Sequence, residues 1–364
     1  MRLAVVAALC AAMACAATTP TPPAATPAGV AAVLAERALA PARPQRTMLL
    51  GVARAAQRLV AVGEHGGVVL SDDNGASWRN AAAVPVDATL TAVRFANARV
   101  GWAVGHLGVV LRTEDGGEHW LRQLDGIALA RLAVAQATAS EVAADAQRLV
   151  DDGPDKPWLD LLVDDDQHLT LVGAFNLVLR SDDGGSQWRV VSQQFTNPNR
   201  LHWYGITRVG DRQVGVGEQA LIAAQTDART DAPLKAIKSP YDGSLFGVLA
   251  TGERSLLVYG LRGHAFVSND GGASWQRAQL GGGGASLNAG LRLTDGRIAL
   301  ADQAGNLFLS ADGGLHFERV PFAWGAPLTG IAEAADGSLV LTSLGGIAAV
   351  PKGVLAQVKS SPRP

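Results

Sequence analysis

The chain has 364 residues, of which 42 are glycine and 18% are charged, and its formal net charge is −2. This length is enough for one large domain or two of medium size. The glycine content favours many tight turns over long helices. Because no surplus of basic residues is available to neutralise phosphates, the composition argues against nucleic acid as a partner and against electrostatic docking on anionic lipid.

The first residues resemble an export signal. Arg2 is the only charged residue before an apolar run that ends at Ala17, and this run is too short to span a bilayer comfortably. Small residues near its end offer cleavage sites. We therefore expect a signal peptide over 1–17 and a Pro/Ala-rich linker without a clear pattern over 18–44. An uncleaved membrane anchor is the alternative.

Both cysteines, Cys10 and Cys15, lie inside this signal. The mature chain would then have no disulfide and no cysteine-bound metal. Cys15 is also a candidate lipidation site, although Ala12 stands at the third position before it, where leucine is expected. The prediction is an exported protein of the periplasm or an equivalent lumen, without a membrane span in the mature chain, and with a lipid anchor at Cys15 as an open alternative.

An internal repeat of the form S/T-x-D-x-G-x-x-W organises the rest of the chain. Five good copies start at Ser71, Thr113, Ser181, Ser268 and Ser310, and an eroded copy without the Gly and the Trp starts at Gln225. Successive starts, the eroded copy included, lie 42, 68, 44, 43 and 42 residues apart. A period of about 40–45 residues is the length of one four-stranded propeller blade. The longest interval holds a blade and an insertion.

A second phrase precedes the first at a fixed distance, and consists of an apolar strand that ends in glycine, a short turn and another apolar strand. Counting both phrases gives seven units. We therefore predict an all-β, seven-bladed β-propeller over 45–358, with a tail over 359–364. Strand 347–350 and the segment 354–358 are expected to close the ring by pairing with residues 48–50.

The insertion, at about 127–150, is rich in alanine and is predicted to be helical. Packing on the edge of the ring is the expected role, and a docking arm for a partner is the alternative.

Each residue type of the repeat suits a structural role in a hairpin. The Asp can accept hydrogen bonds from backbone N–H groups, the Gly can adopt positive φ, and the aromatic residue can fill the space between blades. We predict structural rather than catalytic roles for Asp73, Trp78, Asp115, Trp120, Asp183, Trp188, Asp270, Trp275, Asp312 and Phe317.

The repeat is similar to the Asp-box, also called the bacterial neuraminidase repeat. The fuller phrase that runs from Gly105 to Gly117 resembles the photosystem II stability and assembly factor family over about residues 45–358. This resemblance implies an exported, seven-bladed propeller that binds a membrane-protein complex, such as photosystem II or another envelope assembly, and helps to assemble or stabilise it without chemistry. The eroded fourth copy and the long insertion depart from that pattern.

Two other functions stay open: a sialidase-like glycoside hydrolase and a sugar-binding propeller without catalysis. A sialidase uses a tyrosine nucleophile with an acidic partner. The chain has only Tyr204, Tyr241 and Tyr259, and no Arg-Ile-Pro phrase opens the domain. The acids to inspect for hydrolase chemistry are Glu64, Asp160 and Glu218.

No cofactor and no metal site are predicted. The chain has no His-x-x-x-His phrase, and the aspartate-rich stretch from Asp151 to Asp166 matches no calcium-binding loop. We interpret that stretch as a solvated turn.

The turns that follow the second strand of each blade are expected to lie at one end of the ring. They are predicted to form a rim that binds an envelope protein partner, and they carry Glu64, His65, His106, Phe175, Glu218, Gln219, Arg262, His264 and Gln303. An aromatic patch nearby is expected from His202, Trp203 and Tyr204.

Overall fold

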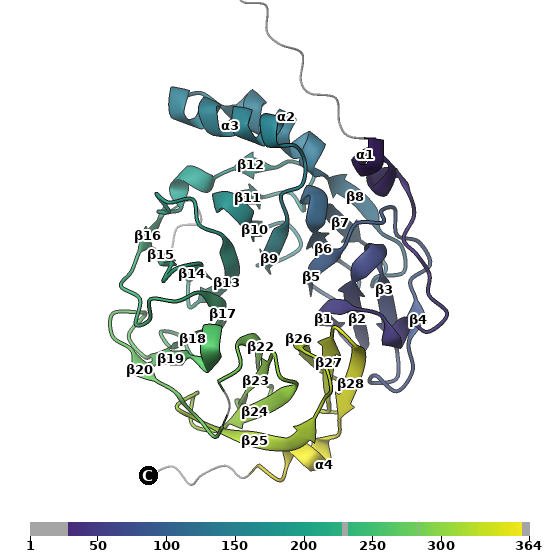
Figure 1. Ribbon diagram of the computed structural model, residues 1–364, viewed down its shortest axis with the longest axis vertical. Coiled ribbons are helices and arrows are strands. Elements are labelled where there is room, and N and C mark those ends of the chain that lie inside the picture. The colour runs from purple at the N-terminus through teal and green to yellow at the C-terminus, as the bar shows by residue number, and fades with distance from the viewer. Residues whose placement is uncertain (1–27, 228–231, 283, 359–364) are drawn as a thin grey trace, which may run out of the picture.

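The computed structural model describes residues 28–227, 232–282 and 284–358. The predictions for the signal peptide, for both cysteines and for the tail 359–364 lie outside these residues. In the described part, seven sheets stand around a central channel like the blades of a propeller (Figure 1). The predicted fold, an all-β seven-bladed propeller with one helical insertion, is confirmed.

The first four blades each contain four antiparallel strands. Blade 1 comprises β1 (Leu49–Ala55), β2 (Arg58–Gly63), β3 (Val68–Ser71) and β4 (Arg79–Asn80). Blade 2 comprises β5 (Leu90–Phe95), β6 (Gly101–Gly105), β7 (Val110–Thr113) and β8 (Leu121–Leu124). Blade 3 comprises β9 (Trp158–Val163), β10 (Leu169–Gly173), β11 (Val178–Ser181) and β12 (Arg189–Val190). Blade 4 comprises β13 (Trp203–Val209), β14 (Arg212–Gly217), β15 (Ile222–Gln225) and β16 (Leu234–Ala236).

Blade 5 also has four antiparallel strands, whereas blades 6 and 7 differ in their outer strands. Blade 5 comprises β17 (Leu245–Ala250), β18 (Leu256–Gly260), β19 (Ala265–Ser268) and β20 (Gln276–Arg277). Blade 6 comprises β22 (Leu287–Arg292), β23 (Ile298–Asp302), β24 (Asn306–Ser310) and β25 (His316–Ala323), and β21 (Gln279–Leu280) adds in parallel to β25. Blade 7 comprises β26 (Leu328–Glu333), β27 (Leu339–Ser343) and β28 (Gly346–Val350).

The core lies between neighbouring blades. Nearly every residue of the second strands is buried, because each blade is covered on both faces by its neighbours. These strands therefore appear in the sequence as continuous apolar runs rather than as alternating ones, which is why the seven units could be counted.

The ring closes by packing rather than by strand pairing. Among the described residues, β28 pairs with β27 alone, so the predicted pairing of 347–350 with residues 48–50 is wrong. Leu49 and Leu59 of blade 1 instead pack against Val340 of blade 7. The hydroxyl of Thr329 donates a hydrogen bond of 2.6 Å to the backbone oxygen of Leu49. The apolar packing that joins each pair of consecutive blades therefore also joins blade 7 to blade 1.

The helices lie at the outer edge of the ring, those of the insertion and the one that precedes blade 1 on one side and the one that follows blade 7 on the other (Figure 1). The insertion forms α2 (Gly126–Gln136) and α3 (Ser140–Asp152), and α2 begins at Asp125, whose carboxylate accepts hydrogen bonds from the backbone of Ile127 and Ala128. The Gln136 side chain bonds the backbone of blade 3 on both sides of Arg189.

Two short helices flank the ends of the propeller. Helix α1 (Ala28–Ala35) lies in the segment expected to be an unpatterned linker, and its Leu34 is buried in the core between blades 1 and 2. Helix α4 (Lys352–Leu355) follows blade 7, and its Leu355 is buried against blades 6 and 7. Apolar side chains therefore anchor both terminal segments to the ring.

Candidate functional site

We call the hairpins formed by the S/T-x-D-x-G-x-x-W phrases the repeat turns. In the first of them, Ser71 donates to the carboxylate of Asp73 at 2.8 Å and accepts from the backbone of Gly75 at 2.8 Å. The Asp73 carboxylate also accepts from the backbone of Ser77 at 2.9 Å. The same three bonds recur in the other four good copies. The polar side chains of the repeat are therefore committed to shaping the turn.

This bonding stabilises the ionised carboxylates. The side chain and then the backbone of Ser77 lower the pKa of Asp73 to about 2. In Asp115 and Asp312, burial raises the pKa, but the hydrogen bonds that each accepts outweigh it and the pKa is lowered overall. An acid that is ionised at all ordinary pH values and surrounded by donors is a poor proton donor, in agreement with the structural role expected for these residues.

The aromatic residues of the repeat pack between blades. Trp120, Trp188 and Phe317 are buried, whereas Trp78 and Trp275 are half-buried. The indole N–H of Trp120 donates to the backbone oxygen of Gly117 at 2.9 Å, which ties the ring to its own turn.

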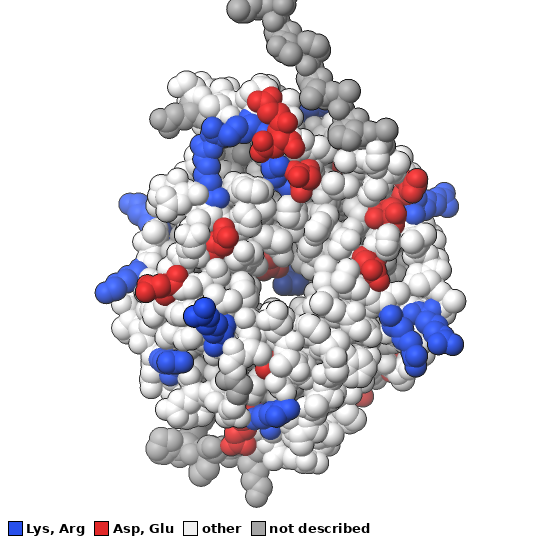
Figure 2. All heavy atoms as spheres, in the orientation of Figure 1, with Lys and Arg blue, Asp and Glu red and all other residues white. Residues whose placement is uncertain are grey.

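The central channel holds a cavity of about 560 Å³. In all seven inner strands (β1, β5, β9, β13, β17, β22 and β26) the register shifts near the first residue. The residue at each shift lines the channel: Leu50, Thr91, Leu159, Tyr204, Phe246, Asn288 and Thr329. A bulge re-aims a side chain in this way. The hollow appears at the centre of the face drawn in Figure 2.

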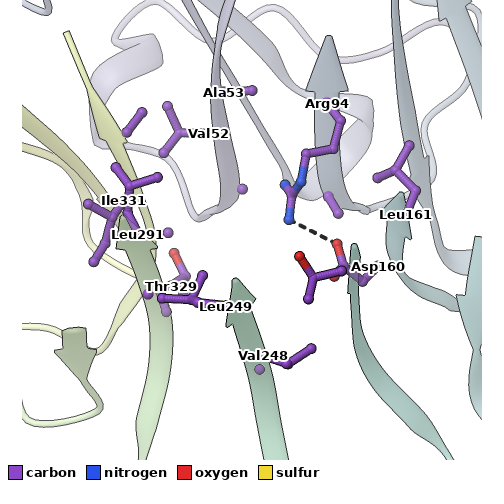
Figure 3. A pocket seen from close by; sticks show the side chains of 18 of the residues that line it. Val52, Ala53, Arg94, Asp160, Leu161, Val248, Leu249, Leu291, Thr329 and Ile331 are labelled. Carbon is purple, nitrogen blue, oxygen red and sulfur yellow. Dashed lines mark hydrogen bonds and ion pairs between the residues drawn. The ribbon is translucent and has the colours of Figure 1, made fainter. Parts of the chain in front are cut away.

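An ion pair occupies one wall of the channel. At the position after the shift, six blades have Gly or Ala, and blade 3 has Asp160. Its carboxylate lies 2.9 Å from the guanidinium of Arg94 (Figure 3). It also accepts a 3.2 Å hydrogen bond from the backbone of Ile206. Burial raises the pKa of Asp160, and the charge of Arg94 opposes part of that shift.

The acids considered for hydrolase chemistry do not converge. Glu64 and Glu218 lie outside the channel wall. Glu64 accepts a 2.9 Å hydrogen bond from the backbone of Met48, and Glu218 accepts one of 2.9 Å from the backbone of His202. Each donor immediately precedes an inner strand. Asp160 is paired with Arg94. Burial and then the charge of Glu218 raise the pKa of Tyr204, the opposite of what a nucleophilic phenol needs.

We call the five turns between the second and third strands of blades 1 to 5 the rim turns; they span residues 64–66, 106–108, 174–176, 218–220 and 261–263. The middle residue of each has positive φ: His65 (53°), Leu107 (56°), Phe175 (55°), Gln219 (46°) and Arg262 (57°). The next residue also has positive φ, as in type I′ hairpins, which favour Asn-Gly. A side chain in this conformation costs about 1–2 kcal/mol relative to the right-handed one.

The structure places most of the predicted rim residues on these turns or beside them. His65, His106, Phe175, Gln219, Arg262 and Gln303 are exposed, and Glu64, His202, Tyr204, Glu218 and His264 are half-buried. Trp203 is fully buried and donates to the side chain of Asn176 at 2.8 Å, so it adds nothing to a surface patch, contrary to expectation. In blade 2 the middle residue is Leu107, which the sequence reasoning missed because turn boundaries are not visible at single-residue precision.

Among the described residues, no cluster of three or more histidine, cysteine or acidic side chains is placed to hold a metal ion. The described helices include none that is both long and apolar enough to cross a membrane.

These features define the class of protein: a seven-bladed propeller that carries repeat turns at one end of five blades and displays side chains on rim turns at the other end of blades 1 to 5. A family model described as photosynthesis system II assembly factor YCF48 matches residues 139–319. A protein from Synechococcus sp. (strain CC9902), named photosystem II assembly lipoprotein Ycf48, is 24% identical over 156 residues, which is 43% of this chain. That match spans about half of the relative, 46% of its length.

Solved structures agree on the fold. YCF48 bound to D1 peptide matches with a TM-score of 0.61 at 16% identity, over 86% of this chain and 98% of that one. YCF48 from Cyanidioschyzon merolae has the same TM-score at 13% identity and the same coverage. A streptogramin B lyase matches with a TM-score of 0.65 at 11% identity, over 87% and 96%. The chain is therefore similar to the photosystem II assembly factors over about half of its length, and the structural likenesses show its propeller fold.

Proposed function

We propose that the chain is a non-enzymatic, exported propeller that binds a membrane-protein complex through its rim and helps to assemble or stabilise it. The observation that carries this proposal is the set of rim turns. Five times the chain places a large or polar side chain at positive φ, where Gly or Asn is the low-energy choice. Backbone strain that recurs without stabilising the fold indicates a functional surface.

The likeness to assembly factors supports the same function. One relative is named as an assembly lipoprotein, and one solved relative is described as bound to D1 peptide. The partner of this chain is proposed by its class alone, a membrane-protein complex of the envelope. Export follows from the signal proposed for 1–17, and tethering would require lipidation at Cys15.

The absence of catalysis belongs to the same proposal. In the channel, Asp160 is neutralised by Arg94, and Glu333 accepts 2.7 Å hydrogen bonds from both the backbone and the hydroxyl of Thr294. Both carboxylates therefore have partners of their own, and neither is poised to protonate or to attack a glycosidic bond.

Affinity capture tests the proposal. The tagged full chain is recovered from detergent-solubilised envelope, and co-purifying proteins are identified by mass spectrometry. A defined membrane-protein complex is expected, and its recovery should fall when Phe175, Arg262 and His106 are replaced together by Ala. In the matched control, Ala replaces Asp72, Arg189 and Arg277, which are exposed on or beside the repeat turns. If both triple variants recover the membrane-protein complex equally well, the proposal is contradicted.

A further inference from the structure

One sector of the rim carries an exposed aromatic side chain. Among the described residues, the exposed large hydrophobic side chains are Leu39, Leu121, Val134, Phe175 and Leu344. Phe175 is the aromatic member of this set, with 53% of its surface exposed. It also occupies the strained middle position of a rim turn, with φ of 55°. An exposed ring held at a conformational cost indicates a contact surface.

Phe175 begins a row of four rings that crosses three blades. Ring centroids lie 4.6 Å apart between Phe175 and His202, 6.3 Å between His202 and Tyr204, and 5.4 Å between Tyr204 and Phe246. The backbone N–H of Phe175 donates to the imidazole of His202 at 3.2 Å, so the first two rings hold each other in place. We call these four residues the aromatic row.

The aromatic row leads from the rim into the channel. Phe175 belongs to the rim turn of blade 3, and His202 immediately precedes the inner strand of blade 4. Tyr204 and Phe246 are the bulge residues of blades 4 and 5, and both line the channel cavity of about 560 Å³. A ligand lying along the row would therefore extend from the outer rim to the mouth of the channel.

The ring orientations favour apolar side chains over sugars. Successive ring planes meet at 68°, 73° and 80°, so the rings contact one another edge to face and the row offers a stepped apolar surface rather than a flat platform on which a sugar could stack. The charged groups beside the row already have partners. Lys156 lies 5.4 Å from the centre of the Phe175 ring and pairs with Asp155, and the Glu218 carboxylate accepts a 2.9 Å hydrogen bond from the backbone of His202.

We propose that the aromatic row binds an extended, uncharged peptide segment of the partner protein. Aromatic or large aliphatic side chains of this segment would pack on the free edges and faces of the rings, with one of them at the channel mouth beside Tyr204 and Phe246. Rigid aromatic anchors commonly dominate the binding energy at protein interfaces. This inference rests on the proposed function, because it assigns the site where that function's partner is bound.

Selection from a phage-displayed library of random linear peptides tests the inference on the full chain. We expect selected peptides rich in aromatic and large aliphatic residues. Their dissociation constants, measured by fluorescence polarisation, should rise by about tenfold or more in the double variant Phe175→Ala with Tyr204→Ala. The matched control, Arg189→Ala with Arg277→Ala, changes two exposed residues beside the repeat turns and should leave affinity unchanged.

Thermal melting of each variant separates loss of binding from loss of folding. Should the double variant unfold, Phe175→Leu with Tyr204→Phe gives a milder change that must still weaken binding. Selected peptides that are predominantly charged, or that bind both double variants equally, overturn the inference. A glycan array that shows sugar binding dependent on Phe175 and Tyr204 also overturns it.

Envelope capture distinguishes failure of this inference from failure of the proposed function. If the wild type recovers a complex and the Phe175→Ala, Tyr204→Ala variant recovers it equally well, the aromatic row is not the site, although the proposed function stands. If the wild type recovers nothing, the proposed function itself fails.

Discussion

The repeat turns and the rim turns both join neighbouring strands within a blade, but different features recur in them. In the repeat turns, a Ser or Thr and an Asp shape the hairpin with their own side chains, so the same residue types recur in every good copy. In the rim turns the backbone conformation recurs, and the middle side chain changes from histidine to leucine, phenylalanine, glutamine and arginine.

This difference indicates at which turn positions the amino-acid sequence of a repeat protein can vary. Where a side chain makes the hydrogen bonds of a turn, its replacement destabilises the turn. Where the backbone closes the turn, the side chain is available for recognition. If turn-shaping and displayed side chains are separated in this way, replacements in the repeat turns should reduce stability most.

Replacement of Trp120 by Ala should give the largest loss of stability. The indole is buried between blades 1 and 2 and donates to Gly117 at 2.9 Å. Removal of a buried side chain of this size costs about 3–5 kcal/mol. Chemical denaturation measures the free energy of unfolding. Trp120→Phe is the control, because Phe317 already fills the equivalent position of blade 6, and it should cost about 1–2 kcal/mol. Equal losses for the two variants would show that inter-blade packing is not the cause.

Asp115→Ala should have the next largest effect. This carboxylate accepts from Thr113 at 2.9 Å and from the backbone of His119 at 3.0 Å, and both donors would lose their partner. For a partly exposed site we expect a loss of about 1–2 kcal/mol. Glu114→Ala in the same turn removes an exposed ion pair with Arg112 and should cost about 0–1 kcal/mol. If the two variants lose the same stability, the turn does not depend on its own aspartate.

The repeat aspartates should also make stability dependent on pH in the acidic range. The pKa of Asp73 is about 2, below its ordinary value of 3.8. Its stabilising effect is therefore complete above pH 3.8 and is lost as the pH falls through about 2. Asp73→Asn removes this titration, so the melting temperatures of variant and wild type should converge as the pH is lowered. The exposed Asp242→Asn is the control, and an unchanged gap between wild type and Asp73→Asn would contradict the assignment.

The sequence was sufficient for the blades because their determinants are local. The repeat phrase and the apolar second strands lie within one period, so the blade count and the roles of residues such as Asp183 follow from spacing alone. The helical insertion was predictable from its alanine content. Helix α1 was not, since eight residues in a Pro/Ala-rich segment are held by the burial of Leu34 rather than by local preference.

The candidate site was predictable only in part, because its geometry depends on long-range contacts. Arg94 and Asp160 meet across two blades and 66 positions of sequence. Tyr204 enters the channel at a bulge while its neighbour Trp203 is buried, and the sequence alone does not reveal that register. The same limit explains why the aromatic row was expected only as a patch near the rim.

Gln219→Gly should have the smallest effect on stability and of the opposite sign. Relief of the positive φ gains about 1 kcal/mol, and the added freedom of the unfolded chain offsets about half of it. The backbone N–H of Gln219, which donates to Ser244 at 3.4 Å, is retained. Gly117→Ala is the counterpart in a repeat turn, where φ is 94° and a new Cβ would lie 3.2 Å from Leu70, and it should destabilise by at least about 1 kcal/mol. Thermal melting compares the two. A destabilised Gln219→Gly variant would mean that rim side chains help to build their turns, and the separation between turns that shape the fold and turns that display side chains would fail.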